Sequence, residues 1–147
     1  MYTIHRAEEQ DIGRIAELEK KIFSDGWSRQ AVSDTFGQKN AVIFGAYDGG
    51  VLVGYLIVYY VLDEGEIARI AVEESFRRQG AAGAMLAELA SFCKEKGITK
   101  LMLEVRQGNK AAIAFYKAHG FKEDGVRRGY YKEPSEDAVL MSRISGR

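Results

Sequence analysis

Hydrophobic positions in the first part of the chain change from strand-like to helical spacing. Residues 2–6 have the character of a short strand, and apolar residues between positions 12 and 23 then follow a mostly helical period behind acidic residues. The segment 24–26 interrupts this helix at a glycine, and Ser28 is suited to cap a second short helix that runs to Phe36. The chain is therefore expected to open with one strand and two helices.

The middle of the chain predicts an antiparallel meander. Residues 41–47 and 51–62 are rich in Val, Ile and Tyr, and the Asp-Gly-Gly segment 48–50 supplies the positive-φ residues that a tight hairpin needs. We expect a second turn at residues 63–65 and a third strand over residues 66–72, where apolar and polar positions alternate. This third strand runs directly into a glycine-bearing segment.

The second half of the sequence alternates helices with strands. Apolar residues line one face of the segment 81–96, and the lysines near its end followed by Gly97 mark a helix terminus. Residues 101–105 predict a mainly buried strand, Asn109 is suited to cap a helix that runs to residue 118, and a last strand pair fills residues 120–144.

The resulting order, β-α-α-β-β-β-α-β-α-β-β, predicts an α/β (α+β) fold. A meander that feeds a βαβ crossover gives a mixed, mostly antiparallel sheet of about seven strands with helices on both faces. The length of 147 residues, 46% of them hydrophobic, is that of one ordinary domain, so we expect a single domain over residues 1–147. The chemistry is expected near the crossover.

Composition narrows the function classes. Lys plus Arg equals Asp plus Glu at 21 each, so no global field favours nucleic acid or an anionic membrane. The chain has one cysteine, Cys93, no apolar run of the roughly 20 residues that span a membrane, and charge too early for a secretory signal. His5 and His119 lie far apart with no cysteine beside them, so no metal site is predicted. We therefore expect a cytoplasmic protein without a disulfide.

The segment between Val72 and the next helix predicts an anion site. Gly80 and the small residues after it open a helix whose first N–H groups are unpaired, and Arg77 and Arg78 add positive charge. The phosphate of a nucleotide-like cofactor suits such a site, although the dinucleotide and nucleoside-triphosphate glycine motifs are both missing. Spacing alone equally permits a tight turn beside solvated arginines.

The wider sequence context resembles one superfamily. Ile70-Ala71-Val72, four further residues and then Arg77-x-x-Gly80-x-Ala82 resemble the signature of the GCN5-related N-acetyltransferase (GNAT) superfamily, and the resemblance extends over nearly the whole chain. Phe23…Trp27-Ser28, Leu103-Glu104-Val105-Arg106 and Arg127-Arg128-Gly129-Tyr130-Tyr131 are similar to the bacterial ribosomal-protein-alanine N-acetyltransferase family within it. Departures from that pattern are Ala82 for a second glycine, Gly26 for a proline, and Gly129.

The resemblance implies an acetyl-CoA-dependent acetyltransferase and assigns residues to its parts. It implies that Glu104 is a base acting through water and that Tyr116 protonates the coenzyme A sulfur. It also implies backbone contacts to the pantetheine arm from Ile70, Ala71 and Val72, pyrophosphate contacts from Arg78, Gln79, Gly80, Ala81, Ala82 and Gly83, and a place beside the cofactor for Asn109. Taken by themselves, Glu104 could be a surface carboxylate, Tyr116 core, and Asn109 only a helix cap.

The acceptor implied by the resemblance is a protein N-terminus, in that family the N-terminal alanine of a small-subunit ribosomal protein. Trp27, Tyr130 and Tyr131 are expected in loops that flank the peptide groove, although they could equally be ordinary loop anchors. An α-amine, with a pKa near 8 against about 10.4 for lysine, has the larger neutral fraction at neutral pH. Two alternatives stay open: an acetyltransferase of lysine or a small amine, and a non-catalytic acyl-CoA sensor.

Overall fold

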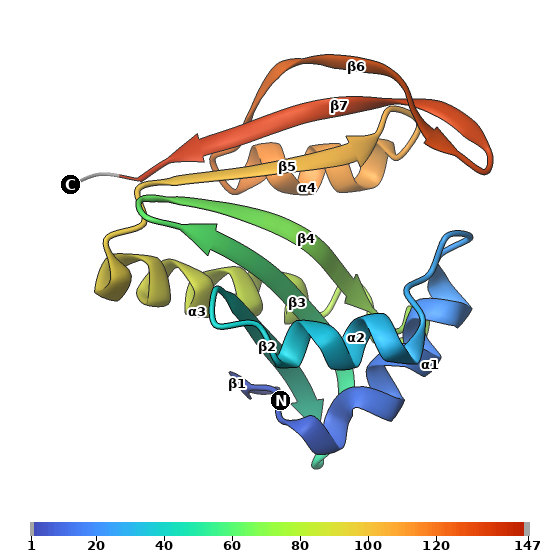
Figure 1. Ribbon diagram of the computed structural model, residues 1–147, viewed down its shortest axis with the longest axis vertical. Coiled ribbons are helices and arrows are strands. Elements are labelled where there is room, and N and C mark those ends of the chain that lie inside the picture. Colours follow the sequence, from blue (N-terminus) through green and yellow to red (C-terminus); the bar gives the residue numbers. More distant parts are fainter. Residues whose placement is uncertain (1, 146–147) are drawn as a thin grey trace.

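Seven strands form one mixed sheet in the computed structural model, which describes residues 2–145 (Figure 1). Their order across the sheet is β1-β2-β3-β4-β5-β7-β6, and neighbours are antiparallel except the parallel pair β4 and β5. The strands are β1 Thr3–Arg6, β2 Ala41–Asp48, β3 Val51–Val61, β4 Glu64–Val72, β5 Lys100–Arg106, β6 Lys122–Lys132 and β7 Ser135–Ile144. The predicted fold class and element order are confirmed.

Two helical layers cover the sheet, one on each face (Figure 1). The helices are α1 Ile12–Ile22, α2 Arg29–Phe36, α3 Ala81–Lys96 and α4 Lys110–Ala118, with short 3-10 turns at Glu9–Asp11 and Glu74–Phe76. Ile15, Leu18 and Val32 bury the α1 and α2 layer against one face, and the apolar faces of α3 and α4 form the larger core on the other. The alternation of side chains along each strand makes both layers possible.

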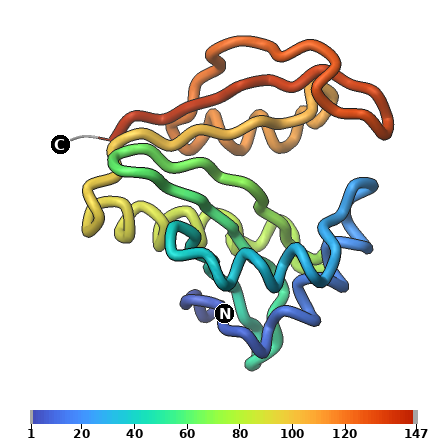
Figure 2. Tube along the Cα trace, in the orientation of Figure 1, coloured from blue at the N-terminus to red at the C-terminus, as the bar shows by residue number. Residues whose placement is uncertain are grey.

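Strands β4 and β5 separate soon after they meet, as Figures 1 and 2 both show. They pair only between Glu64–Ile67 and Lys100–Leu103, although both strands continue further. A β-bulge adds to the divergence, because Ile57 pairs with Arg69 while Val58 pairs with Ile67, which leaves Ala68 as an extra residue in β4. We call this opening between the ends of β4 and β5 the splay.

Most predicted boundaries agree with the structure, and the turn between β3 and β4 is a correction. The sequence placed it at 63–65, whereas it lies at residues 62–63 and Glu64 already belongs to β4. Leu62 has a positive φ of 54° in this turn, whereas Gly65 is a paired strand residue with Leu101 beside it. The final strand pair begins at Lys122, since Gly120, at φ 90°, turns the chain first.

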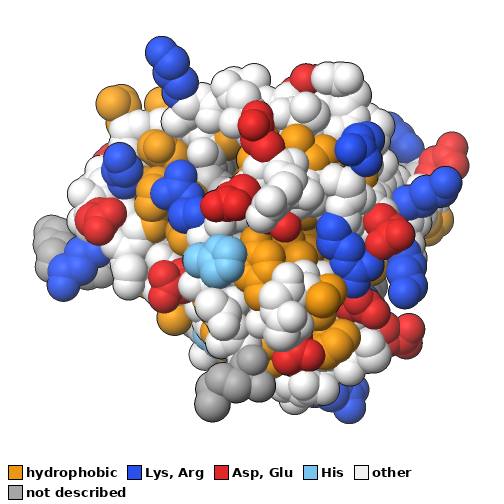
Figure 3. Space-filling view, turned by 90° about the horizontal axis from the view of Figure 1, so that it is seen from below, with side chains coloured by type: hydrophobic (Ala, Val, Ile, Leu, Met, Phe, Trp, Pro, Cys, Tyr) orange, Lys and Arg blue, Asp and Glu red, His pale blue; other side chains and the backbone are white. Residues whose placement is uncertain are grey.

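The surface carries both signs of charge. On the face that Figure 3 shows, basic and acidic side chains lie interspersed among apolar ones, in line with the equal totals in the sequence. Over residues 2–145, no helix has the length and apolar character needed to cross a membrane.

Candidate active site

The anion site predicted at the start of α3 has the expected backbone geometry. Gly80 is the residue before the helix and has φ 89°, a left-handed conformation that favours glycine. The N–H of Ala84 is the first to bond within the helix, at 3.0 Å from the Gly80 oxygen, so the preceding N–H groups of the first turn are unpaired. A Cβ at Gly80 would meet no atom within 4 Å, which leaves room for an anion in front of it. Ala81, Ala82 and Gly83 form that first turn.

The basic residues before this turn have different surroundings. Arg77 donates from Nε to the Val72 oxygen at 2.9 Å and so closes the end of β4. Arg78 has a positive φ of 63° and an exposed side chain, and within residues 2–145 it forms no ion pair. Gln79 accepts a hydrogen bond from the Tyr2 hydroxyl at 2.7 Å. Arg78 is therefore the side chain with freedom to meet a phosphate, while Gln79 is held toward β1.

The edge of β4 at the splay presents backbone groups with no strand partner. Glu73 donates to the Val53 oxygen at 2.8 Å, and the alternation of an antiparallel ladder then turns the N–H and C=O of Val72 and Ile70 away from β3. Strand β5 has already diverged at this point. Of the three predicted residues, Ile70 and Val72 thus face the splay through their backbone, whereas Ala71 is turned toward β3.

Glu104 lies on β5 just beyond the last residue that pairs with β4. Leu103 and Val105 on either side of it are buried against the α3 and α4 layer, so its side chain points to the opposite face. The carboxylate is 18% exposed and forms an ion pair with Arg127 of β6, with Oε2 at 3.0 Å from Nη1. The position is therefore neither open surface nor core, and the carboxylate borders the splay.

Tyr116 lies on the other face of the sheet, in the core beneath α3 and α4. Its ring, in α4, packs edge-on against Phe115 and Phe121 with centroids 5.4 Å away in each case. The residue is 4% exposed, yet no described residue hydrogen-bonds to its hydroxyl, and residues 2–145 contain no fully enclosed polar side-chain atom without a partner. The hydroxyl therefore has access to solvent while burial raises its pKa.

Tyr131 connects the two candidates. Its pKa is raised to about 12, first by burial and then by the charge of Glu104, and its own charge in turn acts on Tyr116. The ring lies 5.0 Å from that of Tyr130 and carries the Arg106 guanidinium at 4.3 Å. Tyr130 has its pKa raised first by its hydrogen bond to the Glu104 carboxylate. Tyr130 thus lies beside Glu104, and Tyr131 is within electrostatic reach of both Glu104 and Tyr116.

The expectation that Tyr130 and Tyr131 occupy a loop was wrong. Both belong to β6, close to its end. The register shifts between Arg127 and Tyr131, and Gly129 has φ 59°, so a bulge rather than a loop accommodates the glycine. The N–H of Gly129 donates to Asp137 of β7 at 2.8 Å, which ties the bulge to the sheet.

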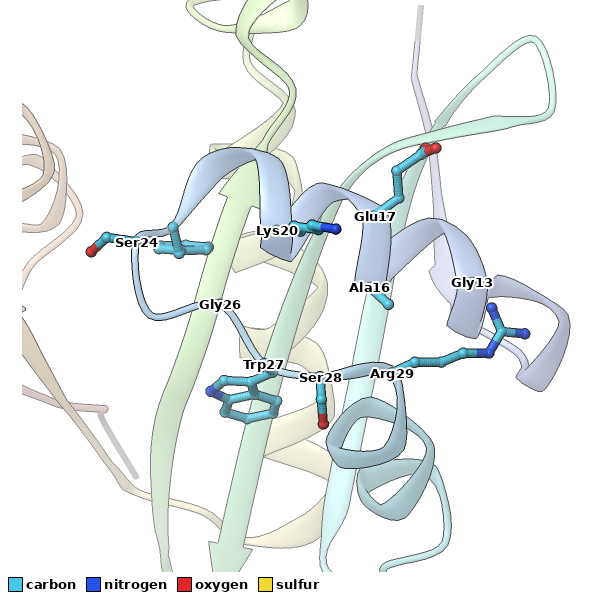
Figure 4. A pocket seen from close by; sticks show the side chains of 10 residues that line it. Gly13, Ala16, Glu17, Lys20, Ser24, Gly26, Trp27, Ser28 and Arg29 are labelled. Carbon is cyan, nitrogen blue, oxygen red and sulfur yellow. The ribbon is translucent and has the colours of Figure 1, made fainter. Parts of the chain in front are cut away.

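Trp27 lies in the loop between α1 and α2, as expected. This loop, residues 23–27, reaches the β6–β7 turn, where the Ser24 hydroxyl donates to the Glu133 oxygen at 2.7 Å. The loop also borders a pocket of about 490 Å³ beside α1 (Figure 4), which is lined by Glu17 and Lys20 of the helix and by Trp27 of the loop. Among the predicted site residues only Trp27 lines this pocket, which is separate from the splay.

Asn109 acts as the helix cap that its residue type suggests. Its side-chain oxygen accepts from the Ala112 N–H at 3.2 Å at the start of α4. The structure confirms Asn109 as a helix cap, and its place beside the cofactor stays a prediction.

Two charged residues of this region escaped the sequence reasoning. Glu66 pairs with Met102 and so faces the Glu104 side of the sheet; its pKa is raised, first by burial and then by the charge of Glu104. Arg127 was read only as part of a motif, yet it is the cation that balances Glu104. Their neighbourhood depends on pairing between distant strands, and only the alternation in β4 hinted at the side on which Glu66 lies.

The fold is that of an acyltransferase: a mixed sheet whose central parallel strands diverge, a glycine-opened helix start after β4, and a carboxylate on β5 beside the divergence. The chain belongs to the acetyltransferase (GNAT) family, whose model matches residues 12–121. It is an acetyltransferase that takes its acyl group from acetyl-CoA.

Its relatives narrow the comparison further. The chain is 33% identical to the [ribosomal protein bS18]-alanine N-acetyltransferase of Escherichia coli (strain K12) over 97% of each chain. It is 35% identical to the N-alpha-acetyltransferase RimI of Mycobacterium tuberculosis over 98% of this chain and 93% of that one. The crystal structure of the Escherichia coli enzyme superposes with a TM-score of 0.91, covering 100% of this chain and 96% of that one. That of Ard1 from Thermoplasma volcanium does so with a TM-score of 0.92 at 28% identity and 99% coverage of both.

The residues present fit acetyl-CoA. The first turn of α3 and Arg78 offer donors suited to a pyrophosphate, and the free edge of β4 offers donors and acceptors suited to an amide-bearing arm. The Tyr116 hydroxyl is a donor without a partner among the described residues. No group of three or more His, Cys, Asp or Glu within residues 2–145 is arranged to hold a metal ion.

Proposed function

We propose that this protein acetylates the α-amino group of a protein N-terminus, and that the natural acceptor is the N-terminal alanine of a small-subunit ribosomal protein. The observation that carries the proposal is the position of Glu104 just beyond the last β4–β5 pair, with its carboxylate facing away from the α3 and α4 layer that holds Tyr116. The similarity to the bS18-alanine and RimI enzymes, each over nearly the full chain, supports the acceptor. The cytoplasm, where ribosomal proteins are made, is the compartment that this acceptor requires.

Acetyl-CoA supplies an activated thioester carbonyl. The backbone of Ile70 and Val72 and the first turn of α3 bind and orient the donor, with Arg78 adding charge. Ala81, Ala82 and Gly83 keep that turn free of bulky side chains, and the Gly80 backbone lets a phosphate approach closely. Asn109 caps the start of α4 and so helps to fix the position of Tyr116 on that helix.

Glu104 prepares the acceptor. A protein N-terminus arrives as an ammonium ion, and the Arg127 guanidinium that pairs with Glu104 in its absence is a 56% exposed side chain that can withdraw. The carboxylate then takes the ammonium proton, through water, so that the neutral amine forms the C–N bond. Because the α-amine has a pKa near 8, this demand on the base is modest.

Tyr116 serves the leaving group. As the C–S bond breaks, the hydroxyl donates its proton to the departing sulfur, and the proton that the nitrogen loses on becoming an amide passes through water and restores the hydroxyl. The raised pKa keeps the hydroxyl protonated at neutral pH. The rings of Trp27, Tyr130 and Tyr131 flank the place where the first residues of the acceptor enter. Tyr130 also donates toward Glu104 and holds the carboxylate in position.

Acceptor specificity is tested by measuring thiol release from acetyl-CoA. Peptides with free alanine, serine or methionine N-termini are compared with the same peptides carrying blocked α-amines and an internal lysine, and with small amines. Turnover confined to free N-termini, best with alanine, is expected. Turnover of blocked lysine peptides or small amines would move the function to those acceptors, and binding of coenzyme A without any turnover would favour a sensor.

A further inference from the structure

A fully buried carboxylate connects α1 to the loop that follows it. Glu19 is 0% exposed, and it accepts three hydrogen bonds: from the Tyr55 hydroxyl at 2.6 Å, the Trp27 N–H at 2.9 Å and Arg69 Nε at 3.0 Å. Burial raises the pKa of Tyr55, which therefore remains a donor to this carboxylate. A buried charge is costly unless every such contact is in place, so this group tolerates one arrangement of its partners.

Arg69 extends the cluster from β4 into the loop. Besides Glu19 it donates from Nη2 to the Asp25 backbone oxygen at 3.0 Å, and the Asp25 carboxylate lies 3.6 Å away. Its guanidinium also lies over the rings of Phe23, at 4.1 Å, and Trp27, at 5.4 Å. One side chain of β4 thus contacts the loop at three residues and the buried carboxylate behind it.

The loop is pressed against α1 as well. A Cβ at Gly26 would come within 2.4 Å of the Glu19 backbone oxygen, so no other residue fits without moving the loop. The close approach requires the absence of a Cβ at position 26, and the hydrogen bond from the Trp27 N–H to Glu19 follows directly after it.

Arg69 follows the bulge residue Ala68 and precedes Ile70, whose backbone faces the splay. The Arg69 side chain therefore links the loop that carries Trp27 to the edge of β4 that, in the proposed function, binds the acyl donor. Charge compensation of Glu19 alone would not need the contact with the Asp25 oxygen or the stacking on Phe23. In some proteins a buried polar interaction fixes how two structural elements are aligned and adds little net stability.

We propose that Glu19 and Arg69 are positioning residues: they hold the loop 23–27 at one distance from β4 and so set the acceptor N-terminus against the thioester. The inference deepens the proposed function, on which its acceptor part rests. It requires that weakening the Arg69 contacts loosens Trp27 and impairs acceptor binding while donor binding is preserved.

Arg69→Lys is the sharpest variant. Lysine keeps a cation for Glu19, but an ammonium cannot reach Glu19 and the Asp25 oxygen together or stack flat on Phe23. Arg14→Lys is the matched control, because Arg14 also joins α1 to the region of β4, through Glu73 and the Leu52 oxygen, without touching the loop. Gly26→Ala is a second, independent way to displace the loop with both charges intact.

Three measurements test whether Arg69 positions the loop 23–27. Trp27 is the sole tryptophan of the sequence, so acrylamide quenching of its fluorescence reports on this loop. The steady-state KM for an alanine-headed peptide reports acceptor positioning, and calorimetric titration with coenzyme A reports the donor site. For Arg69→Lys and Gly26→Ala we expect stronger quenching and a peptide KM raised about tenfold, equivalent to ~1.4 kcal/mol. Their affinity for coenzyme A should stay within about twofold of wild type. In Arg14→Lys all three measured quantities should stay within about twofold of wild type.

Unchanged quenching and peptide KM in Arg69→Lys would overturn the inference, as would an equal effect in Arg14→Lys or a proportionate loss of coenzyme A affinity. If the wild-type protein acetylates no free N-terminus, the proposed acceptor is wrong. The quenching of Trp27 still decides, in that case, whether Arg69 holds the loop.

Discussion

The Tyr116→Phe variant removes one oxygen atom and separates a catalytic role from a structural one. The ring contacts with Phe115 and Phe121 are retained by phenylalanine. No described residue hydrogen-bonds to the hydroxyl, so its loss leaves no partner unsatisfied. We therefore expect the free energy of unfolding to change by less than ~0.5 kcal/mol.

The expected effect on catalysis is much larger. General acid catalysis contributes about 10²- to 10⁴-fold, so kcat should fall by about 10²-fold or more, equivalent to at least ~2.7 kcal/mol in the barrier. Burial raises the pKa of Tyr116, so the hydroxyl is protonated throughout the neutral range and the loss should be the same between about pH 6 and 9. Thiol release at saturating acetyl-CoA and peptide measures kcat, and thermal unfolding measures stability.

Tyr59→Phe is the matched control, because its hydroxyl shares a 2.7 Å hydrogen bond with the buried Thr35 of α2. It should show the reverse pattern: a loss of ~1 kcal/mol, lowering Tm by about 2 to 4 °C, with kcat within about twofold of wild type. The reasoning on Tyr116 is refuted if Tyr116→Phe keeps kcat within about threefold of wild type, or if it loses as much stability as the control.

Three further predictions follow from the site. Glu104→Gln should lower kcat/KM about 10²-fold near pH 7, with a smaller loss above about pH 8 where the α-amine is already neutral; a rate–pH profile that shows a constant loss contradicts this. Gly80→Ala should cost ~1 kcal/mol through its φ of 89° and weaken coenzyme A binding about tenfold, measured by calorimetry, whereas unchanged binding would separate Gly80 from the pyrophosphate site. The folded-state pKa of Glu66 is raised although the residue is exposed, so its ionisation opposes folding weakly, starting as the pH rises above the pKa of the unfolded chain and in full above the folded-state pKa: Glu66→Gln should have a slightly higher Tm at pH 7 and an equal Tm near or below pH 4, and a lower Tm at pH 7 would reverse the sign.

Local signals in the sequence were reliable where a single segment supplied all of the partners. The caps at Ser28 and Asn109 formed as expected, because each side chain bonds to an N–H three residues further along. The hairpin glycines at 49 and 50 adopt positive φ for the same local reason. The turn after β3 was placed at 63–65 and lies at 62–63, because Glu64 and Gly65 pair with Lys100 and Leu101 of a distant strand.

The sequence by itself determined the order of elements, the glycine-opened start of α3 and, through its family motifs, the candidates Glu104 and Tyr116. Only the tertiary structure decided that β4 and β5 part after four paired residues, which leaves Glu104 at the opening with its side chain on the face opposite to α3 and α4. The partnership of Glu104 with Arg127 and of Glu19 with Arg69, residues 50 apart in the latter pair, likewise appears only in the fold. The physical reason is that the partners of buried charges and the registers of strands depend on residues distant in sequence, whereas caps, turns and helix periods depend on residues of the same segment.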